Sequence, residues 1–205
     1  GDILAMSGSR NYFDKDIDGN FNAATAHRQP GSTFKPIVYG VLFNKGYTPD
    51  TILWDVPTQF SPSCPWDKFE TDDTCYSPMN YDELFRGPMK IRDALAQSIN
   101  LPAVQAVYLA GIKDSIDFAK DLGIQSLGDT SRFGLSLVLG GGEVSLLELV
   151  SAYSVFANDG VRNPHNAIQR VYDGNGETIS EYSPSPRRVM PEETSRMISS
   201  ILSDN

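Results

Sequence analysis

The clearest helical pattern in the chain runs from Ser32 to about Asn44. Its apolar residues recur at helical spacing, at Ile37, Val38, Val41 and Leu42. This spacing places them on one face of a helix, where they can pack on a core. Gly46 follows and is a typical helix terminator. We therefore predict a helix over residues 32–44 with one buried face.

Other helical patterns are found further along the chain. Residues 90–123 contain several crowded helical segments, and the segment from Pro191 to Leu202 has the pattern of another helix. A helix is also expected from Ser145 to about Asn158. Ser145 and Glu148 have the spacing of a capping box, in which each side chain bonds to the backbone of the other residue. These segments predict a helix-rich body.

Strand patterns occur near both ends of the chain. Residues 2–9 alternate loosely between apolar and polar positions and indicate a strand, whereas residues 11–22 read as a polar loop. Two short segments, 169–172 and 178–182, flank Asp-Gly-Asn-Gly, which is a hairpin signal. Residues 47–90 show no regular period and are rich in proline and aromatic residues, as in a long insertion beside a cleft. This mixture predicts an α+β domain.

Composition narrows the classes of function. The chain has 205 residues and a net charge of −9, from 17 basic and 26 acidic side chains. This balance argues against nucleic acid as a partner, because nucleic-acid binding requires basic patches. No apolar run is long enough to span a membrane.

Candidate chemistry begins at Ser32-Thr33-Phe34-Lys35, which follows a Pro-Gly break. On a helix, residues three apart share a face, so the amine of Lys35 would lie near the hydroxyl of Ser32. A serine is a weak nucleophile until a base removes its proton, and Lys35 could be that base. A Ser-x-x-Lys pair also arises by chance in a chain of this size, so other segments must support the hypothesis.

A second polar segment, Ser98-Ile99-Asn100, stands between two expected helices. Pro102 is typical of a helix's first turn, so this segment lies at a helix junction where its side chains could face a cleft. Turn chemistry is the ordinary explanation of such a segment. The chain has only two histidines, His27 and His165, which leaves little material for a Ser-His-Asp triad.

Two further patterns resemble ligand-binding motifs but are better explained as ordinary turns. Residues 14–22 resemble the start of a calcium-binding loop, but Thr25 stands where that loop needs a bidentate glutamate. A solvated turn is the better interpretation. Residues 140–142 are three glycines with no phosphate-binding lysine after them, and we interpret them as a flexible turn. We expect neither a metal nor a cofactor.

The motifs together resemble the transpeptidase domain of class A penicillin-binding proteins, which are enzymes of cell-wall cross-linking. The resemblance runs in the family's order through Arg28–Pro36, Pro78–Tyr81, Arg92–Asn100, Leu137–Gly140 and Ala152–Gly160. The superfamily signature pairs Ser-x-x-Lys with a Ser-x-Asn element and Lys-Thr-Gly. The resemblance implies a helical cluster packed on an antiparallel sheet, with the sheet incomplete in this chain.

The resemblance also implies roles for individual residues. Ser32 would be the nucleophile, Lys35 its base, Ser98 a proton relay, and Asn100 a catalytic and substrate-holding residue. Gly31, Trp54 and Asn80 would complete the substrate site. The expected partners are stem peptides ending in D-Ala-D-Ala and β-lactam antibiotics. A carboxypeptidase, a serine β-lactamase and a non-catalytic penicillin sensor or wall-peptide-binding module remain alternatives.

No Lys-Thr-Gly or Lys-Ser-Gly occurs in the chain. We expect residues 1–205 to be the N-terminal portion of one transpeptidase domain, without the Lys-Thr-Gly strand and the C-terminal helix. The rest of the domain, whether on this chain or on a second one, and an upstream glycosyltransferase domain are then expected partners. The family's usual place is the outer face of the bacterial cytoplasmic membrane, held there by an N-terminal anchor.

Two cysteines, Cys64 and Cys75, bracket a polar loop. Given an oxidising compartment, a disulfide between them is favoured over a zinc site, since two thiols with no nearby histidine match no common zinc motif.

Overall fold

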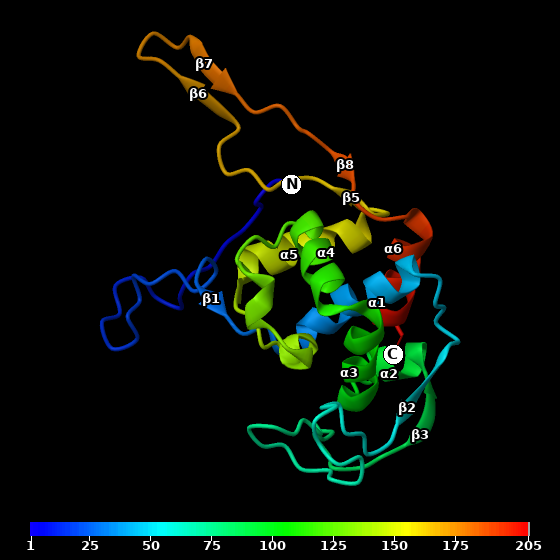
Figure 1. Ribbon diagram of the computed structural model, residues 1–205. Helices are drawn as coiled ribbons and strands as arrows, with labels where there is room; N and C mark the ends of the chain where they lie inside the picture. Colours follow the sequence, from blue (N-terminus) through cyan, green and yellow to red (C-terminus); the bar gives the residue numbers. More distant parts are fainter. Residues whose placement is uncertain (205) are drawn as a thin grey trace.

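A cluster of helices forms the body of the molecule (Figure 1). The computed structural model describes residues 1–204. The α-helices in this range are α1 (Lys35–Asn44), α2 (Ile91–Ala96), α3 (Asn100–Ala110), α4 (Ile112–Leu122), α5 (Leu146–Ala157) and α6 (Glu192–Leu202). Short 3₁₀ turns precede α1 and α5, and those used below are η1 (Gly31–Phe34) and η3 (Leu135–Leu139). The predicted helical regions are therefore confirmed.

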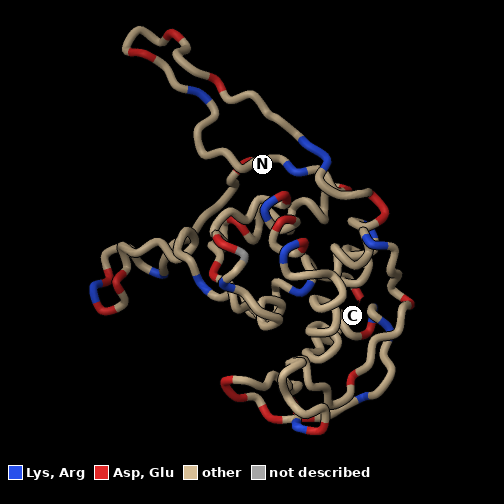
Figure 2. Tube along the Cα trace, viewed as in Figure 1, with Lys and Arg blue, Asp and Glu red and all other residues tan. Residues whose placement is uncertain are grey.

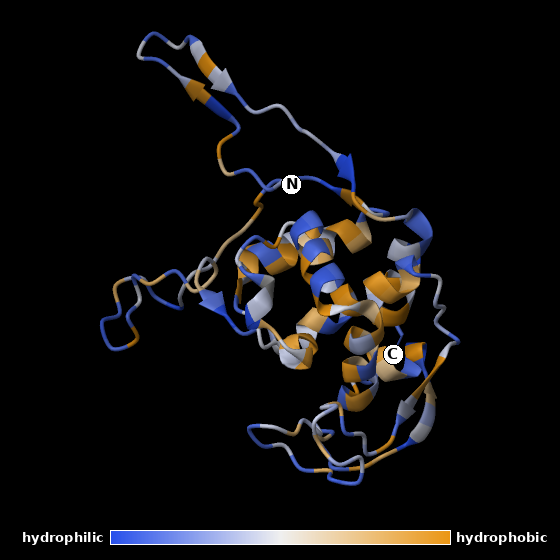
Figure 3. Cartoon of the chain, viewed as in Figure 1, coloured by the Kyte–Doolittle hydropathy of each residue, from blue (hydrophilic) through white to orange (hydrophobic). Residues whose placement is uncertain are grey.

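Helix α1 lies at the centre of this cluster. Every residue from Lys35 to Phe43 is buried, so the helix is surrounded on all sides instead of having one covered face. It contacts α3, α4 and α6, which are far from it in the sequence. A helix buried all round belongs to a core. Figure 3 shows the apolar residues gathered in this helical body.

The strands are short and pair two by two. The pairs are β1 (His27–Arg28) with β4 (Val144–Ser145), β2 (Ile52–Asp55) with β3 (Gly87–Lys90), β5 (Val161–Arg162) with β8 (Arg187–Arg188), and β6 (Arg170–Tyr172) with β7 (Thr178–Glu181). All four pairs are antiparallel. The β6–β7 hairpin projects away from the body, as Figure 1 shows.

Three details differ from the sequence prediction. Residues 2–9 form no strand, because of these residues only Asp2 pairs, in a single bridge to Asn166. A strand needs a neighbour along its length to satisfy its backbone groups. Residues 47–90 are less irregular than expected, since β2 and β3 pair within them. The helix predicted from Ser32 begins with the 3₁₀ turn η1 and becomes α-helical only at Lys35.

A disulfide closes the loop between β2 and β3. It joins Cys64 to Cys75, whose Cα atoms are 5.5 Å apart. The enclosed loop carries exposed acidic residues, which Figure 2 shows in red: Asp67, Glu70, Asp72 and Asp73. No free cysteine remains in residues 1–204. None of the helices described is long and apolar enough to cross a membrane.

Candidate active site

Lys35 is the first residue of α1, and its side chain is 1% exposed. Its Nζ donates hydrogen bonds to the carbonyl of Ser98 at 2.6 Å, the hydroxyl of Ser98 at 3.1 Å and Oδ1 of Asn100 at 2.9 Å. The carbonyl of Ile99 lies at 3.4 Å. The structure thus brings together two segments more than 60 residues apart in the sequence.

The electrostatic surroundings of Lys35 favour its neutral form. All its partners are uncharged oxygens, and within residues 1–204 no carboxylate forms an ion pair with it. Burial disfavours an ammonium, because the surrounding protein solvates charge less well than water. Burial lowers the pKa of Lys35 from 10.5 to about 8. An amine with this pKa can act as a base near neutral pH.

The junction between α2 and α3 presents Ser98 to this amine. Helix α2 ends at Ala96, and Ser98 takes a left-handed conformation with φ of 56°. This conformation is uncommon for a residue other than glycine. It turns the chain sharply before α3 begins at Asn100, and it leaves Ser98 exposed while its hydroxyl stays 3.1 Å from the lysine. The turn and the first residue of α3 therefore carry all four acceptors of the amine, from Ser98, Ile99 and Asn100.

Ser32 lies in η1, one turn before Lys35, and is exposed. Side chains three residues apart eclipse one another in a 3₁₀ turn, so Ser32 and Lys35 share a face. Within residues 1–204 the structure records no hydrogen bond of the Ser32 hydroxyl. Ser32 is thus exposed to solvent, which the role of a nucleophile requires.

The turn that carries Ser32 is fixed by close packing. Gly31 has φ of +58°, and Gly140, just after η3, lies so near that a Cβ on it would be 2.2 Å from the Gly31 nitrogen. The hydroxyl of Tyr153, on α5, donates to the carbonyl of Thr33 at 2.8 Å. The three glycines predicted as a flexible turn therefore include one that packs against Gly31, the residue before the candidate nucleophile.

The role of Asn80 as a substrate contact stays a prediction, and the structure shows its side chain already bonded within the protein. Asn80 is 4% exposed, and its amide is fully engaged with the protein. Its Nδ2 donates to Oδ1 of Asp55 and to the carbonyl of Leu84, each at 2.7 Å. Its Oδ1 accepts from the backbone N–H groups of Asn100 and Leu101, at 3.1 and 3.2 Å. A side-chain amide has two donor hydrogens and two acceptor positions, and all four are occupied in Asn80.

Trp54 and Gly31 remain predictions as substrate contacts. Trp54 lies on β2 and is 55% exposed. Its backbone N–H donates to Oε1 of Gln105 on α3, and its carbonyl accepts from Nε2 of the same side chain. Gly31 directly precedes Ser32, and a Cβ placed on it would meet nothing within 4 Å.

A hollow of about 180 Å³ adjoins the junction residues. It is lined by Asn80, Tyr81, Asp82, Arg86, Gln97, Ser98, Ile99 and Asn100. Asp55 is the residue near this region that the sequence analysis missed. It is completely buried at the end of β2, where its carboxylate accepts from Asn80 and from the backbone of Arg86. A lone aspartate after the apolar run Ile52–Trp54 was the available signal.

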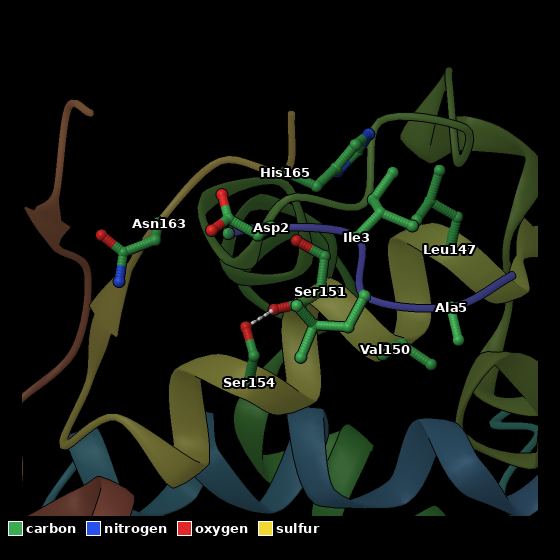
Figure 4. Close-up of a pocket in the computed structure, with 11 residues that line it drawn as sticks. Asp2, Ile3, Ala5, Leu147, Val150, Ser151, Ser154, Asn163 and His165 are labelled. Carbon is green, nitrogen blue, oxygen red and sulfur yellow. Dashed lines mark hydrogen bonds between the residues drawn. The ribbon is translucent and has the colours of Figure 1, made fainter. Parts of the chain in front are cut away.

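Another hollow, of about 340 Å³, lies between the N-terminal segment and α5. In Figure 4, Asp2, Ile3 and Ala5 pass above Val150, Ser151 and Ser154 of the helix, with His165 on the far side. It contains none of the four candidate catalytic residues. Elsewhere, the loop around Asp14 is closed by its own hydrogen bonds, and nowhere in residues 1–204 are three or more metal-ligating side chains grouped.

The fold and the family comparison together identify the class of protein. The sequence model of one protein family, the penicillin-binding protein transpeptidase domain, matches residues 1–205. The chain belongs to this family.

Particular relatives are similar over most of the chain. Penicillin-binding protein 1A of Neisseria meningitidis is 31% identical over 184 residues, which is 90% of this chain and 22% of that protein. Penicillin-binding protein 1F of Bacillus subtilis is 34% identical over 199 residues, covering 95% of this chain and 25% of its own length. The chain thus spans about a quarter of these relatives.

Solved structures show the same fold. Penicillin-binding protein 1A of Haemophilus influenzae has a TM-score of 0.75 at 25% identity, over 90% of this chain and 31% of that one. The PonA1 protein of Mycobacterium tuberculosis, solved in complex with penicillin V, has a TM-score of 0.74 at 22% identity, over 88% of this chain and 48% of its own. The predicted α+β transpeptidase fold is confirmed.

Proposed function

We propose that the chain is the N-terminal portion of a D,D-transpeptidase domain, which cross-links peptidoglycan stem peptides through a serine acyl-enzyme and is acylated by β-lactams. The observation that carries the proposal is the buried amine of Lys35, held by Ser98 and Asn100, one helical turn after the exposed Ser32. Family membership and the class of the relatives agree with it.

The first step is attack of Ser32 on the substrate. Neutral Lys35 has two N–H groups, which suit its two nearest acceptors, the Ser98 carbonyl and Asn100 Oδ1. Its lone pair is then free to take the proton of Ser32 as the hydroxyl oxygen attacks the carbonyl of the penultimate D-Ala. A tetrahedral oxyanion forms, and the backbone N–H of Ser32 supplies one donor to it.

The second step is loss of the terminal D-Ala. The C–N bond breaks, and its nitrogen receives a proton passed from Lys35 through the Ser98 hydroxyl, which lies 3.1 Å from Nζ. Asn100 uses one N–H of its amide on the carbonyl of Met79 at 3.1 Å, which leaves the other to hold the substrate's amide. An amine of a neighbouring stem peptide then attacks the ester carbonyl and forms the cross-link. The bond to the Ser32 oxygen breaks, and the proton lost by the amine passes through Lys35 to that oxygen, which restores the serine.

The rest of the enzyme is part of the proposal. We assign the second oxyanion donor to a Lys-Thr-Gly strand in the remainder of the domain. The chain covers only 31% and 48% of the two solved relatives, which supports such a remainder. We further propose that the whole protein carries a glycosyltransferase domain and a membrane anchor, and works on the outer face of the cytoplasmic membrane.

Labelling with a fluorescent penicillin tests the proposal. The full-length protein is incubated with the drug, digested and analysed by mass spectrometry, with Ser32→Ala as the control. We expect the adduct on the peptide containing Ser32 and none in the variant. A folded protein that is never labelled at Ser32 would overturn the nucleophile assignment. Cross-linking of lipid-linked substrate then separates a transpeptidase from a penicillin sensor.

A further inference from the structure

Helix α3 begins without a cap of its own. Its N-cap residue is Ile99, which has no side-chain acceptor. The first N–H groups of a helix have no partner within the helix, and one buried without a partner is costly. In this chain the acceptor comes from Asn80, twenty residues earlier, whose Oδ1 binds the N–H groups of Asn100 and Leu101.

The orientation of Asn80 is set by Asp55. The amide nitrogen of Asn80 donates to Oδ1 of Asp55 at 2.7 Å. A carboxylate has acceptor oxygens and no donor, so the amide must turn its nitrogen toward Asp55. This contact fixes the amide so that its oxygen faces the helix. The second oxygen of Asp55 accepts from the N–H of Arg86 at 3.0 Å, and the Arg86 guanidinium lies 3.6 Å away. The carboxylate is therefore held in place in turn.

The capped turn carries the groups that hold the amine. Ser98, Ile99 and Asn100 bind Lys35, and Ser98 has a left-handed backbone that the surrounding contacts must maintain. A residue in such a conformation persists only where its neighbours over-determine it. Among residues 1–204, Asn80 is the side chain that joins this turn to Asp55.

We propose that Asp55 and Asn80 act as a pair of positioning residues, which cap α3 from outside and thereby place Ser98 and Asn100 around the Lys35 amine. Asn80 is thus a support of the site and not a contact of the substrate. The inference rests on the proposed function, because its consequence for catalysis is the rate at which Ser32 is acylated.

The test compares acylation of full-length variants by a fluorescent penicillin, below the melting temperature of each. Asn80→Ala is expected to lower the limiting acylation rate about 10- to 100-fold, since small misplacements of catalytic groups have effects of this size. The affinity of the prior non-covalent complex should change far less. Ser195→Ala is the matched control: it removes a buried hydrogen bond of 2.7 Å to Phe156 on α5, and should destabilise without slowing acylation.

Exchanging the side chains of Asp55 and Asn80 should partly restore the acylation rate. Asn80→Asp sets two carboxylates against each other and should slow acylation as Asn80→Ala does. Adding Asp55→Asn restores a donor facing an acceptor, with the new carboxylate still accepting from α3. We expect the double variant to be at least about five-fold faster than Asn80→Asp, with recovery kept partial by the lost donor to Leu84. An equally slow double variant would contradict the pairing.

Amide hydrogen exchange gives a readout that needs no catalysis. In Asn80→Ala the amides of Asn100 and Leu101 should exchange faster, and in Ser195→Ala they should not. Acylation of Asn80→Ala at the wild-type rate, or unchanged exchange of both amides, overturns the inference. A wild-type protein that penicillin never labels contradicts the proposed function instead, and the exchange of these two amides then decides the capping role by itself.

Discussion

At Lys35 the protein buries an amine without giving it a carboxylate partner among the described residues. Its acceptors are two carbonyl groups, a hydroxyl and an amide oxygen. A carboxylate in this place would hold the lysine protonated and remove the base. The absence of a counter-charge among the described residues therefore suits the proposed role of Lys35 as a base, and its cost appears in the stability of the fold.

Acylation should depend on pH through this residue. Burial lowers the pKa of Lys35 to about 8, so roughly a tenth of the amines are neutral at pH 7. We expect the rate at which penicillin acylates the full-length protein to rise with pH and to level off above about 8. Stopped-flow measurement from pH 6 to 10 gives the profile. A flat profile would show that Lys35 is not the base.

The same burial predicts a pH-dependent stability. The folded pKa lies below the unfolded value of 10.5, so protonation destabilises the fold fully below about 8, and this cost is lost as pH rises through 10.5. The shift corresponds to about 3 kcal/mol at neutral pH.

Urea unfolding of the wild type and of Lys35→Met measures this cost. Between pH 7 and pH 10, the free energy of unfolding of the wild type should rise relative to the variant by about 2–3 kcal/mol. Comparison with Lys35→Met cancels the contributions of other titrating groups. Parallel pH curves for the two proteins would contradict the expectation.

Elements with local signals are those that the sequence predicts well. The capping box of α5 forms as expected, with Ser145 and Glu148 bonded to each other's backbone. The β6–β7 hairpin forms around Asp-Gly-Asn-Gly. By contrast, β2 pairs with β3 across more than thirty residues, with Trp54 opposite Pro88. No local period marks such a pairing in a proline-rich segment, so the sequence analysis missed it.

At the contact of η1 and η3, Gly140→Ala should disturb the turn that carries Ser32. The new Cβ would lie 2.2 Å from the Gly31 nitrogen, and φ of +91° already disfavours a side chain. We expect a loss of about 1–3 kcal/mol in stability and slower acylation. Gly174→Ala is the control, because its Cβ would meet nothing within 4 Å. Thermal melts measure the change in stability, and penicillin labelling measures the change in the acylation rate. Equal behaviour of both variants would show that the close approach is unimportant.

For the molecule as a whole, the sequence predicts the two halves of the site but not what joins them. Ser32 and Lys35 are three residues apart, so their shared face follows from the helical repeat. The support of Asn100 by Asn80, and of Asn80 by Asp55, spans separations of 20 and 25 residues. These contacts depend on tertiary packing, so the sequence analysis could not connect Asn80 with Asn100 and overlooked Asp55.

Because α1 links the candidate nucleophile to the core, stability should depend strongly on its packing. Leu42 is 0% exposed in the main cluster. Leu42→Ala should lower the free energy of unfolding by about 2–5 kcal/mol, through lost burial and the cavity left behind. Leu146→Ala makes the same change at a residue that is 55% exposed, and should cost far less. Chemical denaturation compares them. Similar losses in both would mean that α1 is not the centre of the fold.

The disulfide between Cys64 and Cys75 has a consequence for a cut polypeptide. Its loop lies between the segment that carries Ser32 and Lys35 and the segment that carries Ser98 and Asn100. A protease that cleaves one bond inside this loop would divide the chain into two pieces, each with half of the site. The bridge would keep those pieces in one covalent molecule, and they would run apart on a gel only after a thiol reductant is added.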